Sequence, residues 1–90
     1  MVRVSVTQDD IDKGVPHVAY ACPVARAVGR AMGGDGFVLV ESERIECTLQ
    51  HKGFETHSWE TPEVVQKFIE RFDEEGGHER VSPFEFDLPG

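Results

Sequence analysis

The chain has 90 residues, 39% of them apolar, and its 17 acidic residues against nine lysines and arginines give a formal net charge of −8. This length supports one hydrophobic core and predicts a single domain over residues 1–90. The apolar content excludes a disordered chain. The acidic balance disfavours general binding to nucleic acid, because phosphate contacts need concentrated positive charge.

Targeting signals are not evident in the sequence. No apolar run approaches the roughly 20 residues that a membrane helix requires. Arg3 lies near the start with no hydrophobic segment after it, so no signal peptide is expected. The two cysteines, Cys22 and Cys47, are too few for the disulfide framework of a small secreted domain. A cytoplasmic location without membrane contact is therefore expected.

The first elements are a strand and a short helix. Residues 2–7 alternate β-branched and polar side chains with a period of two, which predicts a half-buried strand. Thr7 can cap a helical turn over residues 8–13, and Gly14 can end it. Residues 15–21 are apolar without a clear period, and we interpret them as a buried connection.

The next helix is marked by Pro23 at its first position and by the segment Gly33-Gly34-Asp35-Gly36 after its end. At 100° per residue, one face of this helix collects small and medium apolar side chains. These are Val24, Ala25, Ala27, Val28, Ala31 and Met32. Such a face predicts close packing against the rest of the core.

Three strands follow in the middle of the chain. Residues 37–41 and 44–50 form two apolar runs separated by a short connection, which predicts a hairpin. Residues 54–59 can extend it to a third strand. Together they predict an antiparallel meander.

A second amphipathic helix begins at residues 61–63, where Thr61 offers a capping hydroxyl and Pro62 suits the first helical position. It runs to about Glu74, before Gly76–Gly77. Its apolar stripe consists of Val64, Val65, Phe68, Ile69 and Phe72. Residues 83–88 alternate again and predict a last, edge strand.

These elements predict an α+β fold, in which a small mixed or antiparallel sheet of about four to five short strands packs against two amphipathic helices.

Cys22 is the first candidate for chemistry. It lies at the predicted start of a helix that carries Arg26 and Arg30 and no acid, a setting that lowers the pKa of a thiol. The structural interpretation is burial beside Tyr20 and Val24, which is favoured because free cysteine is among the most buried residue types. A redox-sensing or thiol-dependent activity at Cys22 is kept as the alternative.

A metal site is a second possibility, since zinc accepts a set of two histidines and two cysteines such as His17, Cys22, Cys47 and His51. Their spacing is unlike that of structural zinc sites, which pair ligands two to four residues apart. A catalytic Cys22 would need a base, and nothing in the spacing selects His17, His51 or His57. No metal, cofactor or catalytic residue is therefore expected, and an enzyme is disfavoured.

The negative charge is concentrated in residues 60–90, which carry nine acidic and three basic side chains. Glu70, Asp73, Glu74 and Glu75 lie at the end of the second predicted helix, where acids oppose the helix dipole. They lack the ligand pattern of a calcium loop. Two interpretations stay open, a solvated surface that keeps the protein soluble and a surface that binds a partner.

Several motifs resemble those of a known group of proteins. They are Val6-Thr7 with Asp10-Ile11 and Gly14, Cys22-Pro23-Val24-Ala25 with Ala27, Phe68-Ile69 with Phe72-Asp73, and Val81 with Pro83-Phe84 and Phe86. The most distinctive is Cys-Pro-Val-Ala at residues 22–25. On these motifs the chain resembles small uncharacterised proteins encoded by actinobacterial bacteriophages and related mobile elements. The resemblance implies a viral or prophage origin and assigns no catalytic residue.

The function expected from these observations is a non-enzymatic accessory protein that binds a host protein through its acidic C-terminal region or an exposed sheet edge. The alternative is the thiol activity at Cys22. Mimicry of DNA ranks last, because a charge of −8 over 90 residues is mild for an imitation of phosphates.

Overall fold

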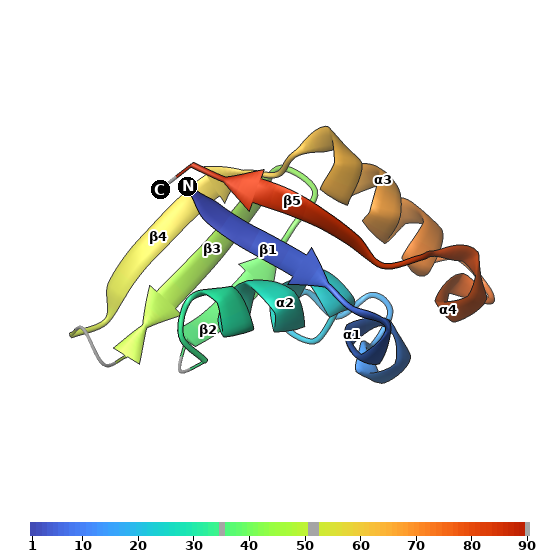
Figure 1. Ribbon diagram of the computed structural model, residues 1–90, viewed down its shortest axis with the longest axis horizontal. Helices are drawn as coiled ribbons and strands as arrows, with labels where there is room; N and C mark the ends of the chain where they lie inside the picture. Colours follow the sequence, from blue (N-terminus) through green and yellow to red (C-terminus); the bar gives the residue numbers. More distant parts are fainter. Residues whose placement is uncertain (35, 51–52, 90) are drawn as a thin grey trace.

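The computed structural model describes residues 1–34, 36–50 and 53–89. In these residues the order of elements is β1 (Val2–Val6), α1 (Gln8–Lys13), α2 (Pro23–Ala31), β2 (Gly36–Val40), β3 (Arg44–Leu49), β4 (Glu55–Glu60), α3 (Glu63–Phe72), α4 (Gly77–Arg80) and β5 (Phe84–Leu88) (Figure 1). The predicted α+β class is confirmed. Within the described part, none of the helices has the length and apolar character needed to cross a bilayer.

The five strands form two antiparallel sheets. β1 pairs with β5, which brings the two ends of the chain side by side, with Val2 opposite Leu88 and Val6 opposite Phe84 (Figure 1). The other sheet is the predicted meander, in the order β2-β3-β4. β5 is thus an edge strand, as expected, but its partner is the strand farthest from it in the sequence.

One hydrophobic core joins the two sheets. α2 packs against β1 from one sheet and β2 from the other, so it links them. Alternate side chains of the strands point into this core: Val4, Val6, Val38, Val40, Ile45, Cys47, Leu49, Phe86 and Leu88. Burying each large aliphatic or aromatic side chain contributes about 1.5–3 kcal/mol, and the alternation fixes which face of each sheet is inside.

The small-residue face of α2 is confirmed for Val24, Ala25, Ala27 and Val28, all of which are buried. The helix ends at Ala31, which is exposed. Gly33 and Gly34 follow with positive φ angles of 108° and 89°, a conformation that glycine adopts without strain.

The expectation of a buried connection over residues 15–21 is wrong. Val15 and Tyr20 are exposed, and the segment runs over the surface. The carbonyl of Ala19 accepts a hydrogen bond from Val40 N–H (3.0 Å), so this loop lies against the outer side of β2. The apolar residues here cover a strand edge instead of filling the core.

The start of α3 also differs from the prediction. Pro62 is the N-cap residue and makes no side-chain capping bond. The hydroxyl of Thr61 instead donates to the carbonyl of Glu41 (2.7 Å), which ties α3 to the end of β2. Val64, placed on the apolar stripe, is 49% exposed, and the helix ends at Phe72, before Glu74.

Candidate interaction face

Cys22 is the N-cap residue of α2, and its side chain is only 4% exposed. Its sulfur accepts a hydrogen bond from the N–H of Ala25 (3.4 Å). Burial raises the pKa of the Cys22 thiol and outweighs the backbone N–H groups that lower it. The shift is opposite to the one expected of a reactive thiolate, and the geometry is that of a structural cap.

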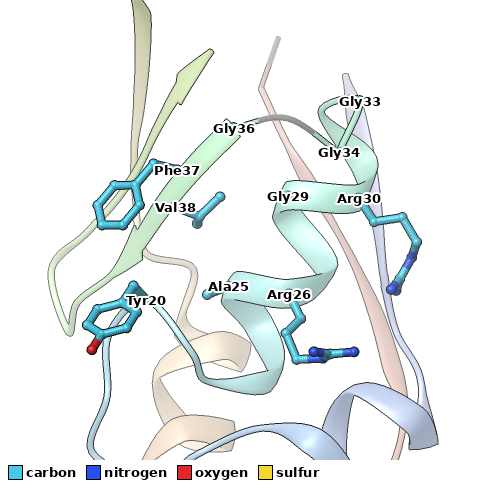
Figure 2. Close-up of a pocket in the computed structure, with 10 residues that line it drawn as sticks. All are labelled: Tyr20, Ala25, Arg26, Gly29, Arg30, Gly33, Gly34, Gly36, Phe37 and Val38. Atoms are coloured by element: carbon cyan, nitrogen blue, oxygen red, sulfur yellow. The ribbon is translucent and has the colours of Figure 1, made fainter. Parts of the chain in front are cut away.

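The two arginines of α2 do not reach the thiol because an acid from α1 engages them. Arg30 binds both carboxylate oxygens of Asp10, at 2.9 and 2.7 Å, and Arg26 Nε lies 3.5 Å from the same carboxylate. Burial opposes ionisation of Asp10, but hydrogen bonds from Arg30 and Thr7 prevail and hold its pKa at about 2. In Figure 2 both guanidinium groups point away from β2.

We expect Cys22 to react slowly with iodoacetamide in the native protein, because its sulfur is buried and its pKa is raised. Timed alkylation followed by peptide mass spectrometry separates Cys22 from Cys47. The rate for the Cys22 peptide should rise by at least about tenfold in denaturant, since the reaction then no longer requires opening of the fold. Native alkylation as fast as that of the unfolded chain would favour the thiol alternative.

The four weak candidates for zinc ligands are not all brought together. His17 and Cys22 line a cavity of about 340 Å³ with Asp73, whereas Cys47 lies in the interior of β3. His51 lies outside the described residues. In residues 1–34, 36–50 and 53–89, no group of three or more His, Cys, Asp or Glu side chains is arranged to hold a metal ion.

His17 comes near Cys22 through an unusual backbone conformation, with a φ angle of 63°. Its N–H donates to Asp73 Oδ1 (3.0 Å), and its Nδ1 lies 3.8 Å from Asp73 Oδ2. This contact fastens the loop before α2 to the end of α3. His57, the other described candidate base, stacks on Trp59 on β4, with ring centroids 6.0 Å apart.

The predicted acidic surface is heterogeneous. Asp73 is half-buried and bonded to His17, and Glu74 pairs with Arg80 (3.5 Å), while Glu70 and Glu75 are exposed. Glu70 and Glu74 line a groove of about 660 Å³ that also contains Lys67, Arg71 and Arg80. The surface is therefore mixed in charge, and its role in binding a partner stays a prediction.

A different surface stands out on the three-stranded sheet. The strand register places three cross-strand rows on the side away from the core: Phe37, Thr48 and Thr56; Leu39, Glu46 and Ser58; Glu41, Arg44 and Glu60. All nine are exposed or half-buried, while Val38, Val40, Ile45, Cys47 and Leu49 on the opposite face are buried. We call these nine residues the open face.

An exposed aromatic pair borders the open face. Tyr20 and Phe37 stack with ring centroids 6.1 Å apart and an interplanar angle of 27°, yet they are 62% and 52% exposed. Figure 2 shows them together on one side of β2, while Val38 points toward α2. Large apolar groups that stay in water despite packing on each other are typical of contact surfaces.

A groove of about 590 Å³ lies beside this pair, between α2 and β2 (Figure 2). The helix side is lined by the small residues Ala25, Gly29 and Gly33 and by Arg26 and Arg30, whose guanidinium groups point away from β2 (Figure 2). A Cβ atom at Gly29 would approach the Val38 side chain to only 3.7 Å, an ordinary contact. The width of the groove thus depends on small residues.

The floor of this groove is the outer edge of β2, the terminal strand of its sheet. The Glu41 N–H donates to the Arg44 carbonyl (2.9 Å), which marks a hydrogen-bonded pair. Such pairs alternate along an antiparallel ladder, so Val38 and Val40 turn their peptide groups away from β3. Val40 bonds to Ala19, whereas among the described residues no backbone bond outside the ladder involves Val38.

The opposite end of the open face is acidic. Glu41, Glu43, Glu46 and Glu60 line one cavity of about 690 Å³ together with Arg44, Thr61 and Gln66. We call these four glutamates the hairpin-end carboxylates. The sequence did not reveal them as a group, because they are scattered over 20 residues and only the β2-β3-β4 pairing brings them together.

Neither Tyr20 nor Phe37 was singled out from the sequence as functional. The run 37–40 is apolar throughout, so its alternation does not say which side chains face water. Comparison with known proteins supplies no further guide, since no family model, no curated protein and no solved structure matches the chain.

Proposed function

We propose that this protein is a non-enzymatic binding module that captures another protein through the open face and the adjoining edge of β2. The observation that carries the proposal is the exposed Tyr20–Phe37 stack, at the junction of that face with the groove between α2 and β2. Aromatic side chains are enriched at the energetic centres of protein interfaces, where they are covered on binding.

The groove suits an extended segment of the partner. A chain lying beside β2 would pair with the outward peptide groups of Val38, which bond to no described residue outside the ladder, in the manner of strand addition to an exposed edge. The loop that bonds Ala19 to Val40 limits this pairing to the Gly36–Val38 end. The aromatic pair would then provide the apolar anchor next to the added strand.

The resemblance to bacteriophage proteins, which stays a prediction, suggests that the partner is a host protein. Small accessory proteins of this kind act by occupying a surface on a larger protein, and no chemistry at Cys22 is needed for that. The proposal keeps the predicted function and moves its site from residues 70–75 to the open face.

Replacing Phe37 with serine is expected to reduce capture of the partner by about tenfold, as loss of an interface anchor does. Immobilised wild-type protein and the variant are incubated with the same host lysate, and retained proteins are quantified by mass spectrometry. A partner is a protein held by the wild type and depleted on Phe37→Ser.

The matched control is Val64→Ser, because Val64 is 49% exposed and lies on α3, outside the nine residues of the open face. Both substitutions replace partly exposed side chains and should change stability by no more than about 1 kcal/mol, which thermal unfolding checks. If the two variants retain the same proteins in the same amounts as the wild type, the open face is not the binding surface and the proposal fails.

A further inference from the structure

Resting on the proposed function, we propose that the segment bound at the open face is cationic, with lysine or arginine side chains above the hairpin-end carboxylates and an apolar side chain against Phe37. This proposal is supported by the order of the three rows, in which the number of charged side chains increases from the row of Phe37 to the row of Glu41. The row of Phe37 carries no charge, the middle row carries Glu46, and the last row carries Glu41, Arg44 and Glu60.

The charge of this end is not neutralised by the residues that the structure describes. Four glutamates share the cavity with a single cation, Arg44. Several acids elsewhere are paired, as in Arg3 with Asp87 and Lys67 with Glu63, but among the described residues no ion pair of Glu41, Glu43, Glu46 or Glu60 is found. A partner can supply the missing positive charge.

The same charges argue against other occupants. A second copy of this chain would bring another net charge of −8 to the interface, and two open faces would oppose acidic ends in a parallel arrangement. An acidic segment would be repelled by the hairpin-end carboxylates. A basic segment is attracted both by the local carboxylates and by the field of the whole protein, which speeds association.

The order of the three rows along β2 also fixes the order of apolar and basic side chains in the bound segment. Phe37, Leu39 and Glu41 follow one another at alternate positions along one strand, about 6–7 Å apart. A segment that lies over the open face in extended form, parallel to β2, therefore presents an apolar side chain at one end and a basic one about four residues away. Side chains four residues apart lie on the same side of an extended segment, so an apolar half followed by a basic half matches the two ends of the face.

The test is a titration of ¹⁵N-labelled protein with two hexapeptides, one of three valines followed by three lysines and one of three valines followed by three glutamates. We expect the lysine peptide to shift the amide signals of Phe37, Leu39 and Glu46, and the glutamate peptide to leave them unchanged. Raising the salt from about 0.05 M to about 0.5 M should weaken the lysine peptide's binding several-fold, because exposed charges are screened.

A charge-neutralised pair locates the contact. Glu41→Gln with Glu60→Gln should weaken binding of the lysine peptide by about fivefold, as expected for two solvent-exposed charge pairs. The matched control is Glu70→Gln with Glu75→Gln, which removes the same charge from the other acidic surface and should change binding by less than about twofold. The amide spectrum of each variant verifies its fold.

The inference is overturned if the lysine peptide gives no shifts at millimolar concentration, if its shifts fall on α3, or if the control pair weakens binding as much as Glu41→Gln with Glu60→Gln. Equal binding of the glutamate peptide also overturns it. These outcomes are separate from the proposed function, because capture that depends on Phe37 but not on the hairpin-end carboxylates would leave a protein-binding module with an uncharged partner.

Discussion

Replacing Gly77 with alanine is expected to lower the free energy of unfolding by about 3 kcal/mol, the upper part of the range for overpacking. Gly77 is buried at the start of α4, directly behind the end of α3. An ideal Cβ atom there would overlap the carbonyl oxygen of Phe72 at 1.8 Å. The obstacle is backbone, so no side-chain rotation can relieve it.

The neighbouring Gly76 provides the control because it needs glycine for a different reason. Its φ angle is 74°, while nothing lies within 4 Å of an added Cβ. Gly76→Ala should therefore cost only the left-handed backbone penalty, about 1–2 kcal/mol. Urea unfolding of both variants measures the two costs. If Gly76→Ala proves the more harmful of the two, the close approach at Phe72 does not control this turn.

These two glycines show what the sequence reveals and what it hides. The pair predicts the end of a helix, and α3 does end before it. Nothing local predicts that the chain turns at once into α4. There His78 packs edge-on against Phe72 and contacts the carbonyl of Gly14 (3.0 Å), a residue far from it in the sequence.

In the strands, too, the sequence reveals the local features and hides the long-range contacts. Period-two alternation correctly placed residues 2–6, 44–49 and 84–88 in strands, because half-buried strands impose that pattern. Pairing of β1 with β5 spans nearly the whole chain and leaves no local trace. The open face was hidden for a related reason, since both sides of β2 carry apolar residues and only the fold decides which side is covered.

The environment of Cys22 depended on a long-range contact as well. Its position before Pro23 at a helix start was predicted correctly. The two arginines do not lower the pKa of the Cys22 thiol as expected, because Asp10 from α1 binds them. The sequence pattern did not reveal this role of Asp10. Helix position is a local property, whereas the charge around a thiol is set by every element packed there.

The second large effect is expected at Asp10. Asp10→Asn should lower the free energy of unfolding at pH 7 by about 2 kcal/mol. The carboxyl pKa is about 2 in the folded protein against an ordinary 3.8, and each pKa unit corresponds to about 1.4 kcal/mol. The carboxylate joins three elements, because Thr7 at the end of β1 and Arg30 on α2 both donate to it. Asparagine keeps the shape and one acceptor but loses the charge.

The sign of the pH dependence follows from the direction of that shift. A carboxyl group whose pKa is lowered on folding stabilises fully above its unfolded pKa, and this contribution disappears as the pH falls from about 4 to about 2. The difference between wild type and Asp10→Asn should therefore be constant from pH 7 to pH 5 and fall to roughly half by pH 3. Urea unfolding of both proteins at each pH measures it.

Asp12→Asn serves as the control for Asp10, since Asp12 is on the same helix but exposed, and its described partner is the neutral side chain of Gln8 (2.9 Å). Its substitution should change stability by less than about 0.5 kcal/mol at any of these pH values. A difference for Asp10→Asn that stays constant down to pH 3 would mean that the lost stability comes from packing and hydrogen-bond geometry instead of charge. A stability difference that falls as Asp10 takes up a proton would instead show that the ionised carboxylate matters. Held by Arg30 and Thr7, it would then fasten α1 and α2 to β1.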